Sequence, residues 1–310
     1  MKKSTIAISL GDLNGVGIEI ALRSHEELCT MAKPIYCISQ KMLEQACKKL
    51  AITRPEQMTL FPISGDFEIE PSKISKKSGR NSYTSFLKAI ELCEKKIADA
   101  VVTLPIHKEA WHKAGIEHKG HTDMLREHFK QEAIMMLGCD KLYVALFTEH
   151  IPLKKVASKI KTKELREFLL ALAPNIKGKK IAVLGLNPHA GDGGVLGKEE
   201  KYISKAIKEA NKKLQEEIFA GPMVPDTAFS KTMRKEYHHF VAMYHDQGLI
   251  PLKALHFDES INVSLNLPII RTSVDHGTAF DIAYKNKKPS CKSYINAVKA
   301  ALAQINDQGI

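Results

Sequence analysis

The chain lacks the features that mark secreted, membrane-spanning and repetitive proteins. Its six cysteines, at positions 29, 37, 47, 93, 139 and 291, form no Cys-x-x-Cys pair, which argues against a disulfide framework. No stretch approaches the roughly 20 apolar residues of a membrane span. The apolar run after Lys3 is too short for the core of a signal peptide. With no repeat or low-complexity tract either, the sequence predicts a cytoplasmic protein with no membrane partner.

Aromatic residues are also scarce, at 6% of the chain, whereas basic residues are plentiful. The 46 Lys and Arg exceed the 35 Asp and Glu, and the net charge of +11 raises the question of a nucleic-acid or anionic partner. The lysines, however, are scattered along helix-like stretches without the interleaved aromatics of a strand-binding surface, as at positions 154, 155, 159, 161 and 163. We predict solvated helix faces and no nucleic-acid partner.

The sequence does contain a regular alternation of strand and helix patterns. Runs rich in β-branched residues predict buried strands at 5–10, 35–39, 58–63, 100–104, 143–148, 180–186 and 240–244, and a strand-like stretch at 261–274. Amphipathic helices are predicted at 83–98, 163–173, 198–218 and 294–305, a helical pattern starting at Thr278, and a surface loop at 71–81. This alternation predicts an α/β fold with a mixed, mostly parallel, helix-covered sheet.

Three glycines form a tight turn after the first predicted strand, in the stretch GDLNGVGIE at 11–19. Such a turn brings backbone amides close to a phosphate at a helix N-terminus. The spacing is not Gly-x-Gly-x-x-Gly, and no acidic residue stands where a dinucleotide-binding fingerprint needs one. A purely structural turn explains the pattern at least as well.

Three histidines each follow a predicted strand: His150, His189 in the glycine-rich stretch 187–194, and His245 with Asp246 beside it. Open α/β sheets bind ligands at the carboxyl ends of their strands, so three imidazoles can meet there around a divalent metal. A single such histidine is ordinarily a hydrogen-bonded loop residue, but three at equivalent positions favour a metal site. His25, His112, His118, His128 and the pair at 238–239 lie on polar or charged stretches and are predicted to be at the surface.

Lys253 and Arg271 are candidates for binding an anion. Arg271 closes the apolar run at 267–270, where a guanidinium needs a partner, although an internal ion pair would serve as well as a carboxylate or phosphate ligand. His121 and Thr122 place an imidazole and a hydroxyl at the start of a predicted helix, and the alternative for Thr122 is a simple helix cap.

Six stretches in order resemble the 4-hydroxythreonine-4-phosphate dehydrogenase family of vitamin B6 biosynthesis. They are GDLNGVGIE at 11–19, GHTD at 120–123, NPHAGDGG at 187–194, GPMVPDTAF at 221–229, AMYHDQG at 242–248 and IIRTSVDHGTAFDIA at 269–283. The likeness runs nearly the whole chain. It departs at Leu13 and Ile18, where the family carries prolines, which predicts a freer turn without loss of a catalytic group.

The resemblance implies roles for particular residues. His150, His189 and His245 would bind a divalent metal, whether zinc, magnesium or cobalt, and five residues would contact the substrate: His121, Thr122, Lys253, Asn262 and Arg271. It implies an isocitrate/isopropylmalate dehydrogenase-like fold of two domains, 1–118 with 276–310 on the cofactor side and 119–275 with the metal, substrate and dimer interface. The active site would lie in the interdomain cleft and be completed by the second subunit of a homodimer.

A more distant likeness joins HGTAFD at 276–281 to the isopropylmalate dehydrogenases and implies that Gly277 and Asp281 bind NAD. The carboxylate of Asp281 would repel the extra phosphate of NADP, which makes NADP the less favoured cofactor.

The activity implied is NAD-dependent oxidation of 4-phosphooxy-L-threonine to 2-amino-3-oxo-4-phosphooxybutanoate, which decarboxylates to 3-amino-2-oxopropyl phosphate on the route to pyridoxal 5'-phosphate. Asp246 or a metal-bound water would take the hydroxyl proton. Three alternatives remain open: a sister dehydrogenase acting on another phosphorylated hydroxy acid, a metal-dependent hydrolase, and a phosphate-binding module without catalysis.

Overall fold

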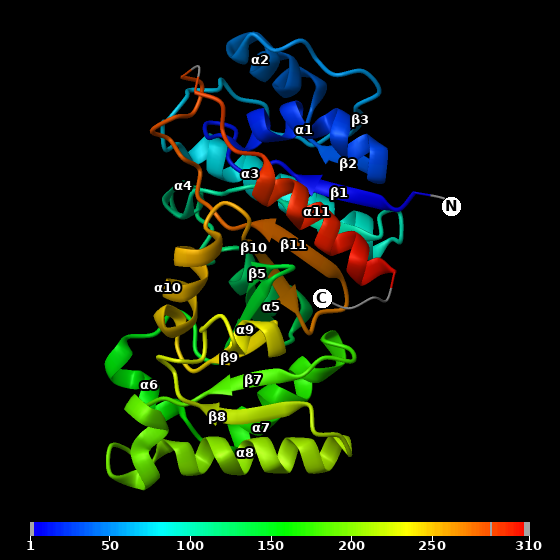
Figure 1. Cartoon of the computed structure of the whole chain (residues 1–310). Helices are drawn as coiled ribbons and strands as arrows, with labels where there is room; N and C mark the ends of the chain where they lie inside the picture. The colour runs from blue at the N-terminus through cyan, green and yellow to red at the C-terminus, as the bar shows by residue number, and fades with distance from the viewer. Residues whose placement is uncertain (1–2, 286, 307–310) are drawn as a thin grey trace. The chain divides into compact units, whose positions relative to one another are not determined.

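A computed structural model describes residues 3–285 and 287–306, in which strands and helices alternate along the chain (Figure 1). The described chain divides into two compact units. Unit 1 comprises the residues up to Gln131, Ile261–Val263 and the residues from Leu267 onward; unit 2 comprises Glu132–Ser260 and Ser264–Asn266. The α/β class with a mixed, mostly parallel sheet agrees with the sequence prediction.

Unit 1 is built on five parallel strands in the order β3-β2-β1-β4-β11. β1 and β4 are apolar except at their ends, as expected of parallel strands covered on both faces, and Ile6, Ala7 and Ile8 are fully buried. The strands are β1 (Thr5–Ser9), β2 (Lys33–Cys37), β3 (Thr59–Phe61), β4 (Ala100–Thr103) and β11 (Ile270–Val274). The helices are α1 (Gly17–Met31), α2 (Gln40–Leu50), α3 (Lys76–Glu94), α4 (Lys108–Lys113), α5 (His121–Phe129) and α11 (Lys292–Ile305).

Unit 2 has the strand order β5-β6-β9-β7-β8, in which β5 and β6 are antiparallel and the other pairs are parallel. The strands are β5 (Ile134–Cys139), β6 (Leu142–Leu146), β7 (Ile181–Leu184), β8 (Phe219–Met223) and β9 (His239–Ala242). The helical segments are η1 (Leu153–Lys155), α6 (Val156–Lys159), α7 (Thr162–Leu172), η2 (Ala173–Asn175), η3 (Pro188–Gly194), α8 (Glu199–Leu214), α9 (Met233–Glu236) and α10 (His245–His256). β10 (Ile261–Leu265) belongs in part to each unit, with Ile261–Val263 in unit 1 and its last two residues in unit 2.

α5 and β11 lie in unit 1, although the sequence assigned residues 119–275 to the second domain. β11 pairs in parallel with β4, with Ile270 opposite Ala100. Met124 and Leu125 of α5 join the hydrophobic cluster around Trp111, whose Nε1 donates a hydrogen bond to Ser82 Oγ at 2.8 Å. Strand pairing and core packing between residues distant in sequence therefore define this unit.

Two segment predictions were wrong. The predicted loop 71–81 ends at Ser75, whose side chain caps α3 by accepting a hydrogen bond from the Ser78 amide, so residues 76–81 are helical. The stretch after Thr278 forms turns rather than a helix over 280–285. Strands β5 and β8 were not predicted, and the stretch 261–274 proves to be two strands, β10 and β11.

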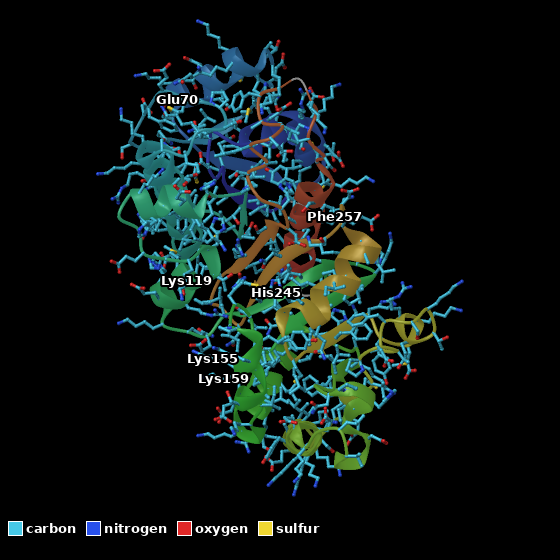
Figure 2. All side chains as sticks on the ribbon, turned by 90° about the vertical axis from the view of Figure 1, so that its left-hand side faces the viewer. Glu70, Lys119, Lys155, Lys159, His245 and Phe257 are labelled. Carbon is cyan, nitrogen blue, oxygen red and sulfur yellow. The ribbon has the colours of Figure 1, made fainter. Side chains whose placement is uncertain are left out.

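Two surface predictions for histidines were also wrong. His25 is 2% exposed because its ring contacts the Tyr36 hydroxyl at 2.9 Å and the Glu56 carbonyl at 3.0 Å. His239 is 2% exposed because it begins the central strand β9. The five scattered lysines are all exposed, as predicted, with Lys155 and Lys159 labelled in Figure 2. No described helix has the length and apolar character needed to cross a membrane.

α3 packs closely on α4 at Gly79, and a substitution there tests this contact. A Cβ at this position would lie 2.0 Å from the carbonyl oxygen of Ala110, so we expect Gly79→Ala to lower the free energy of unfolding by about 2 kcal/mol or more. Denaturant unfolding without added ligands measures the change. The matched control is Gly277→Ala, because an added Cβ there meets no heavy atom within 4 Å. Equal stability of the two variants would contradict the packing argument.

Candidate active site

The three strand-end histidines lie on three neighbouring strands of unit 2. β9 pairs in parallel with β6 on one side and with β7 on the other. His150 follows β6, His245 begins α10 directly after β9, and His189 lies in η3 after β7. Because parallel strands end at the same edge, the structure places all three histidines at one edge of the sheet of unit 2, as the sequence predicted.

Hydrogen bonds join these three strand ends to one another. Thr148 Oγ1, after β6, donates to the Met243 carbonyl at 2.6 Å. Gln247 Oε1 accepts from the Met243 amide at 2.7 Å, and its Nε2 donates to the Gly185 carbonyl, also at 2.7 Å. The polar residues around His245 therefore fix the edge from which the histidines project.

His150 and His245 lie close together, with ring centroids 5.4 Å apart. His245 Nδ1 is 2.6 Å from the Asp246 carboxylate, which leaves Nε2 free to bind a ligand, as metal-binding histidines commonly are arranged. Among the described residues, the three histidines do not form a set whose ligand atoms all lie within 4.8 Å of one another. The structure thus brings two of the predicted ligands together and leaves exposed His189 on the next strand end.

The loop that carries His189 has an unusual backbone. Residues 189–193 all have positive φ angles, including 50° for His189 and 42° for Asp192. Side-chain-bearing residues rarely adopt this region, and such strain concentrates at ligand sites. Glu200, 8% exposed, anchors the base of the loop by accepting hydrogen bonds from the amides of Leu186 and Asn187 at 2.9 and 2.7 Å. Sequence reasoning missed Glu200.

Unit 1 contains a cluster of cations around Arg271. Arg271, 1% exposed, donates from NH2 to Thr103 Oγ1 at 2.7 Å, and burial lowers the pKa of its guanidinium to about 9. Burial, then the charges of Arg271 and Lys108, hold the pKa of His121 well below its ordinary value. His121 is therefore a neutral imidazole near two cations, an arrangement suited to an anionic ligand.

Lys108 was missed by the sequence reasoning. It begins α4, a few residues after β4 ends at Thr103. A Cβ at Gly120, the residue before α5, would lie 3.7 Å from Lys108 Cε. The three histidines were selected because each follows a predicted strand. Lys108 also follows a predicted strand, so the same criterion would have selected it.

The remaining predicted substrate residues fall in both units. In unit 1, the Asn262 side-chain oxygen is buried and, within the described residues, has no hydrogen-bond partner, which leaves an acceptor for a ligand donor. Thr122 is 7% exposed and is the second residue of α5. The N-cap of this helix is Gly120, so the alternative that Thr122 serves as a simple helix cap was wrong. In unit 2, Lys253 Nζ donates to Ser260 Oγ at 3.3 Å and lies 5.0 Å from the centre of the Phe257 ring.

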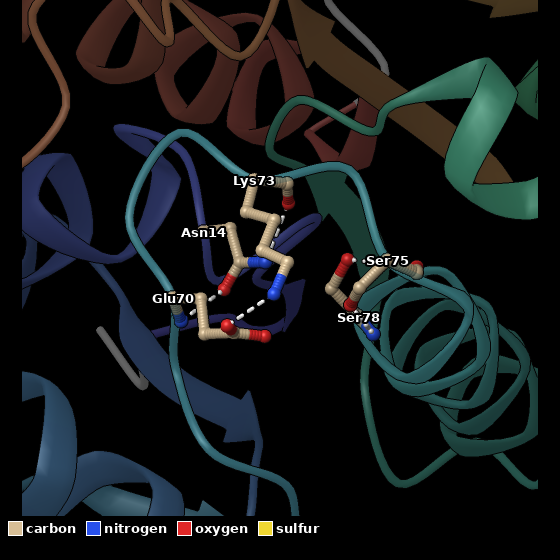
Figure 3. Close-up of polar contacts among 5 residues, drawn as sticks. All are labelled: Asn14, Glu70, Lys73, Ser75 and Ser78. Carbon is tan, nitrogen blue, oxygen red and sulfur yellow. Dashed lines mark hydrogen bonds and ion pairs between the residues drawn. The ribbon is translucent and has the colours of Figure 1, made fainter.

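The glycine turn after β1 is structural. The Gly15 amide donates to the Asp12 carbonyl and the Val16 amide to the Thr278 carbonyl, both at 3.0 Å, so neither points to a phosphate. Asn14 holds a second loop, because its side chain accepts from the Glu70 amide and donates to the Lys73 carbonyl (Figure 3). These contacts fix the turn although Leu13 replaces the family's proline.

The predicted cofactor residues lie against this turn in unit 1. Gly277 and Asp281 are exposed, and Thr278 between them contacts the turn, since a Cβ at Gly15 would lie 2.7 Å from the Thr278 carbonyl oxygen. The ring of His107 stacks on Phe280 at 5.0 Å. The segment 276–281 is therefore held by its interior residues and leaves the Asp281 side chain accessible.

Comparisons with known proteins agree with the resemblance. A family model described as pyridoxal phosphate biosynthetic protein PdxA matches residues 30–301. A 4-hydroxythreonine-4-phosphate dehydrogenase from Sulfurimonas denitrificans is 62% identical over 98% of this chain and 98% of its own, and one from Campylobacter fetus is 54% identical over 97% and 98%. The crystal structure of a 4-hydroxythreonine-4-phosphate dehydrogenase from Klebsiella pneumoniae matches with a TM-score of 0.84 at 30% identity, covering 98% of each chain.

Asp12 makes stability depend on pH. Burial raises the pKa of its carboxyl from 3.8 to about 6, against hydrogen bonds from the Asn14 amide and the Ser78 hydroxyl. The folded chain therefore holds a proton that the unfolded chain releases over this range, so the free energy of unfolding falls as the pH rises from about 4 to 6, by up to about 3 kcal/mol.

We expect Asp12→Asn to remove most of this fall, as measured by denaturant unfolding at the two pH values. Exposed Asp226→Asn is the control and should keep the wild-type pH dependence. A wild-type slope in the Asp12 variant would show that Asp12 is not the group responsible.

Proposed function

This chain belongs to the family of the pyridoxal phosphate biosynthetic protein PdxA and is a dehydrogenase, and on that premise we propose that it oxidises 4-phosphooxy-L-threonine with NAD. The product, 2-amino-3-oxo-4-phosphooxybutanoate, is a β-keto acid and decarboxylates to 3-amino-2-oxopropyl phosphate. The observation that carries the proposal is the set of three histidines on the adjacent strand ends of β6, β9 and β7. Their placement supports metal-assisted chemistry on a hydroxyl group.

We propose that His150, His189 and His245 hold the divalent metal. Imidazole donors suit zinc and cobalt well, and the Asp246 contact orients His245 with Nε2 outward. When bound, the metal lowers the pKa of the substrate hydroxyl and stabilises negative charge on the ketone oxygen during loss of carbon dioxide. That Asp246 also takes the hydroxyl proton stays a prediction, and its side chain, 71% exposed, is accessible to proton exchange with water.

The substrate, a phosphate ester that carries both an ammonium group and a carboxylate, would be bound by several cationic side chains and by one buried side-chain oxygen. Arg271, with Lys108 nearby, would bind an anionic end of the substrate, and neutral His121 and the hydroxyl of Thr122 would add hydrogen bonds. Lys253 supplies a further cation in unit 2. The unpartnered side-chain oxygen of Asn262 suits the substrate ammonium group.

Unit 2 exposes several large apolar side chains that a second subunit of a homodimer would cover. α10 exposes Ile250 and Leu255 at 68% and 42%, and Phe257 at its end is 67% exposed (Figure 2). Val195 and Leu196, directly after the His189 loop, are 81% and 46% exposed. Large apolar side chains of this kind mark subunit contacts. We propose that a second copy of the chain covers them and completes the active site.

The second candidate is a sister dehydrogenase that acts on another phosphorylated hydroxy acid, because the same cations and histidines would serve that substrate. Metal-stripped enzyme, resupplied with single ions and NAD, is assayed by NADH absorbance against a panel of hydroxy acids. Fastest turnover of 4-phosphooxy-L-threonine supports the proposal. Preference for another acid selects the sister activity, and hydrolysis without NADH formation would point to a metal-dependent hydrolase.

His189→Ala tests the metal ligands. We expect loss of bound metal and at least about a 100-fold loss of dehydrogenase activity, because removing even an outer-shell partner of a ligand costs 10- to 100-fold. Metal content by atomic emission and NADH formation are measured on the same sample. His238→Ala, an exposed histidine outside the site, is the control. An active, metal-free His189 variant would refute the ligand assignment.

Asp281→Ser tests the cofactor preference. Removing the exposed carboxylate should lower the ratio of kcat/KM for NAD to that for NADP by about tenfold, which corresponds to about 1.4 kcal/mol of relieved repulsion. Steady-state kinetics with both cofactors give the ratio, and Asp226→Ser should leave it unchanged. Equal use of NAD and NADP by the wild-type protein would defeat the assignment of Asp281.

A further inference from the structure

A second cluster of metal-binding side chains lies in unit 2, at the other end of α10 from His245. It consists of Cys139, His256 and Glu259, and each contributes a ligand atom within 4.8 Å of the other two. Cys139 ends β5, His256 ends α10, and Glu259 lies three residues beyond it. None of the three takes part in the activity proposed above.

The turn between β5 and β6 supplies hydrogen bonds to the buried Cys139 thiol, although the net effect of its surroundings raises the pKa. Cys139 is 2% exposed and stands opposite Leu142 in the antiparallel pair. Burial raises the pKa of its thiol, whereas hydrogen bonds from the backbone amides of Lys141 and Leu142 lower it. Two amides donating to one sulfur partly replace the solvation that burial removes, which is the support a buried metal-bound thiolate needs.

The end of α10 supplies the nitrogen and oxygen donors. His256 Nδ1 lies 3.5 Å from Glu259 Oε2, and the His256 side chain is 13% exposed. The other ring nitrogen, Nε2, is buried and has no hydrogen-bond partner within the described part of the chain. Lys141 Nζ lies 3.0 Å from Glu259 Oε2 and is the cation that balances this carboxylate. A buried imidazole nitrogen without a partner calls for a ligand.

We propose that Cys139, His256 and Glu259 form a second metal site, one that takes zinc or a similarly thiophilic divalent ion. A soft thiolate with an imidazole selects such an ion over magnesium, which prefers oxygen ligands. Ligand atoms of tetrahedral zinc lie about 3.5 Å apart, so a shift of about 1 Å closes the site, with water as the fourth ligand. Binding releases the thiol proton to solvent.

The site would fasten the β5–β6 turn to the C-terminal end of α10. This helix carries His245 at its first residue and Lys253 in its last turn, so the metal would brace the element that holds both. Because the ion binds the folded chain, it stabilises that chain by mass action. The role is structural and stands whether or not the three histidines bind a catalytic metal.

Cobalt binding to the full-length, metal-stripped protein tests the site. Co²⁺ bound to a thiolate gives a near-ultraviolet sulfur-to-cobalt charge-transfer band that three histidines cannot produce. We expect this band to saturate with one equivalent of the thiolate-bound ion and to be displaced by Zn²⁺. His189→Ala should keep the band, which separates this site from the proposed catalytic one. Absence of the band from the wild-type protein would overturn the proposal without further variants.

Three substitutions in the cluster and its ion pair, with one control, locate the metal ligands. Cys139→Ser should abolish the band, whereas Cys93→Ser, which changes another buried cysteine, should retain it. His256→Gln should weaken Zn²⁺ binding at this site by more than about tenfold. Lys141→Ala should tighten it, because the ammonium group no longer competes for Glu259.

Two results would contradict the proposed metal site. A band that persists in Cys139→Ser, or Zn²⁺ binding at this site unchanged in both His256→Gln and Lys141→Ala, would show that the three residues form only an ion-paired cluster. Circular dichroism of each variant shows whether a lost band reflects a lost fold. If Cys139→Ser fails to fold, the Zn²⁺ affinities of His256→Gln and Lys141→Ala decide the question.

Discussion

The parallel pairing of β6, β9 and β7 is the constraint on which the site in unit 2 depends. It brings His150, His189 and His245 to one edge of the sheet, although His150 and His189 are 39 positions apart and His189 and His245 are 56 apart. Hydrogen bonds made by the side chains of Thr148 and Gln247 then join the ends of these three strands. The strained loop around His189 is tolerated because Glu200 holds its base, so local strain is offset by hydrogen bonds that the sheet itself positions.

Desolvation is the corresponding constraint in unit 1. Burial lowers the pKa of Arg271 and of His121 and raises that of Asp12, so each group is less stable in its charged form than it would be in water. For Asp12 the cost is reduced by two hydrogen bonds, one from the Asn14 amide in the turn and one from the Ser78 hydroxyl of α3. Arg271 donates a hydrogen bond to the Thr103 hydroxyl, which offsets part of the cost of its burial. The same physical effect thus acts on a carboxyl in the turn after β1 and on the cationic residues proposed to bind the substrate.

Much of the arrangement could be predicted because buried strands and amphipathic helices have local periodic signatures. The seven predicted strand runs all correspond to strands, and the strand-end rule placed His150, His189 and His245 correctly at one edge. The errors occurred where the local signal was weak or was overruled by packing. β5 is rich in methionine rather than β-branched residues, and the polar start of α3 is helical because Ser75 caps it and Ser78 is buried against Asp12.

The sequence by itself determined the class of fold, the family and a set of candidate residues for the chemistry. The class of fold and the strand-end histidines follow from residue types and short-range spacing, whereas the family follows from the resemblance of six stretches of sequence. The tertiary structure alone decided that Arg271 donates to Thr103, that Lys108 lies near His121, and that Cys139 meets His256 and Glu259. These contacts join residues of different helices and strands, and two of them join residues more than 100 positions apart. Only the packing of completed elements sets the distances between them.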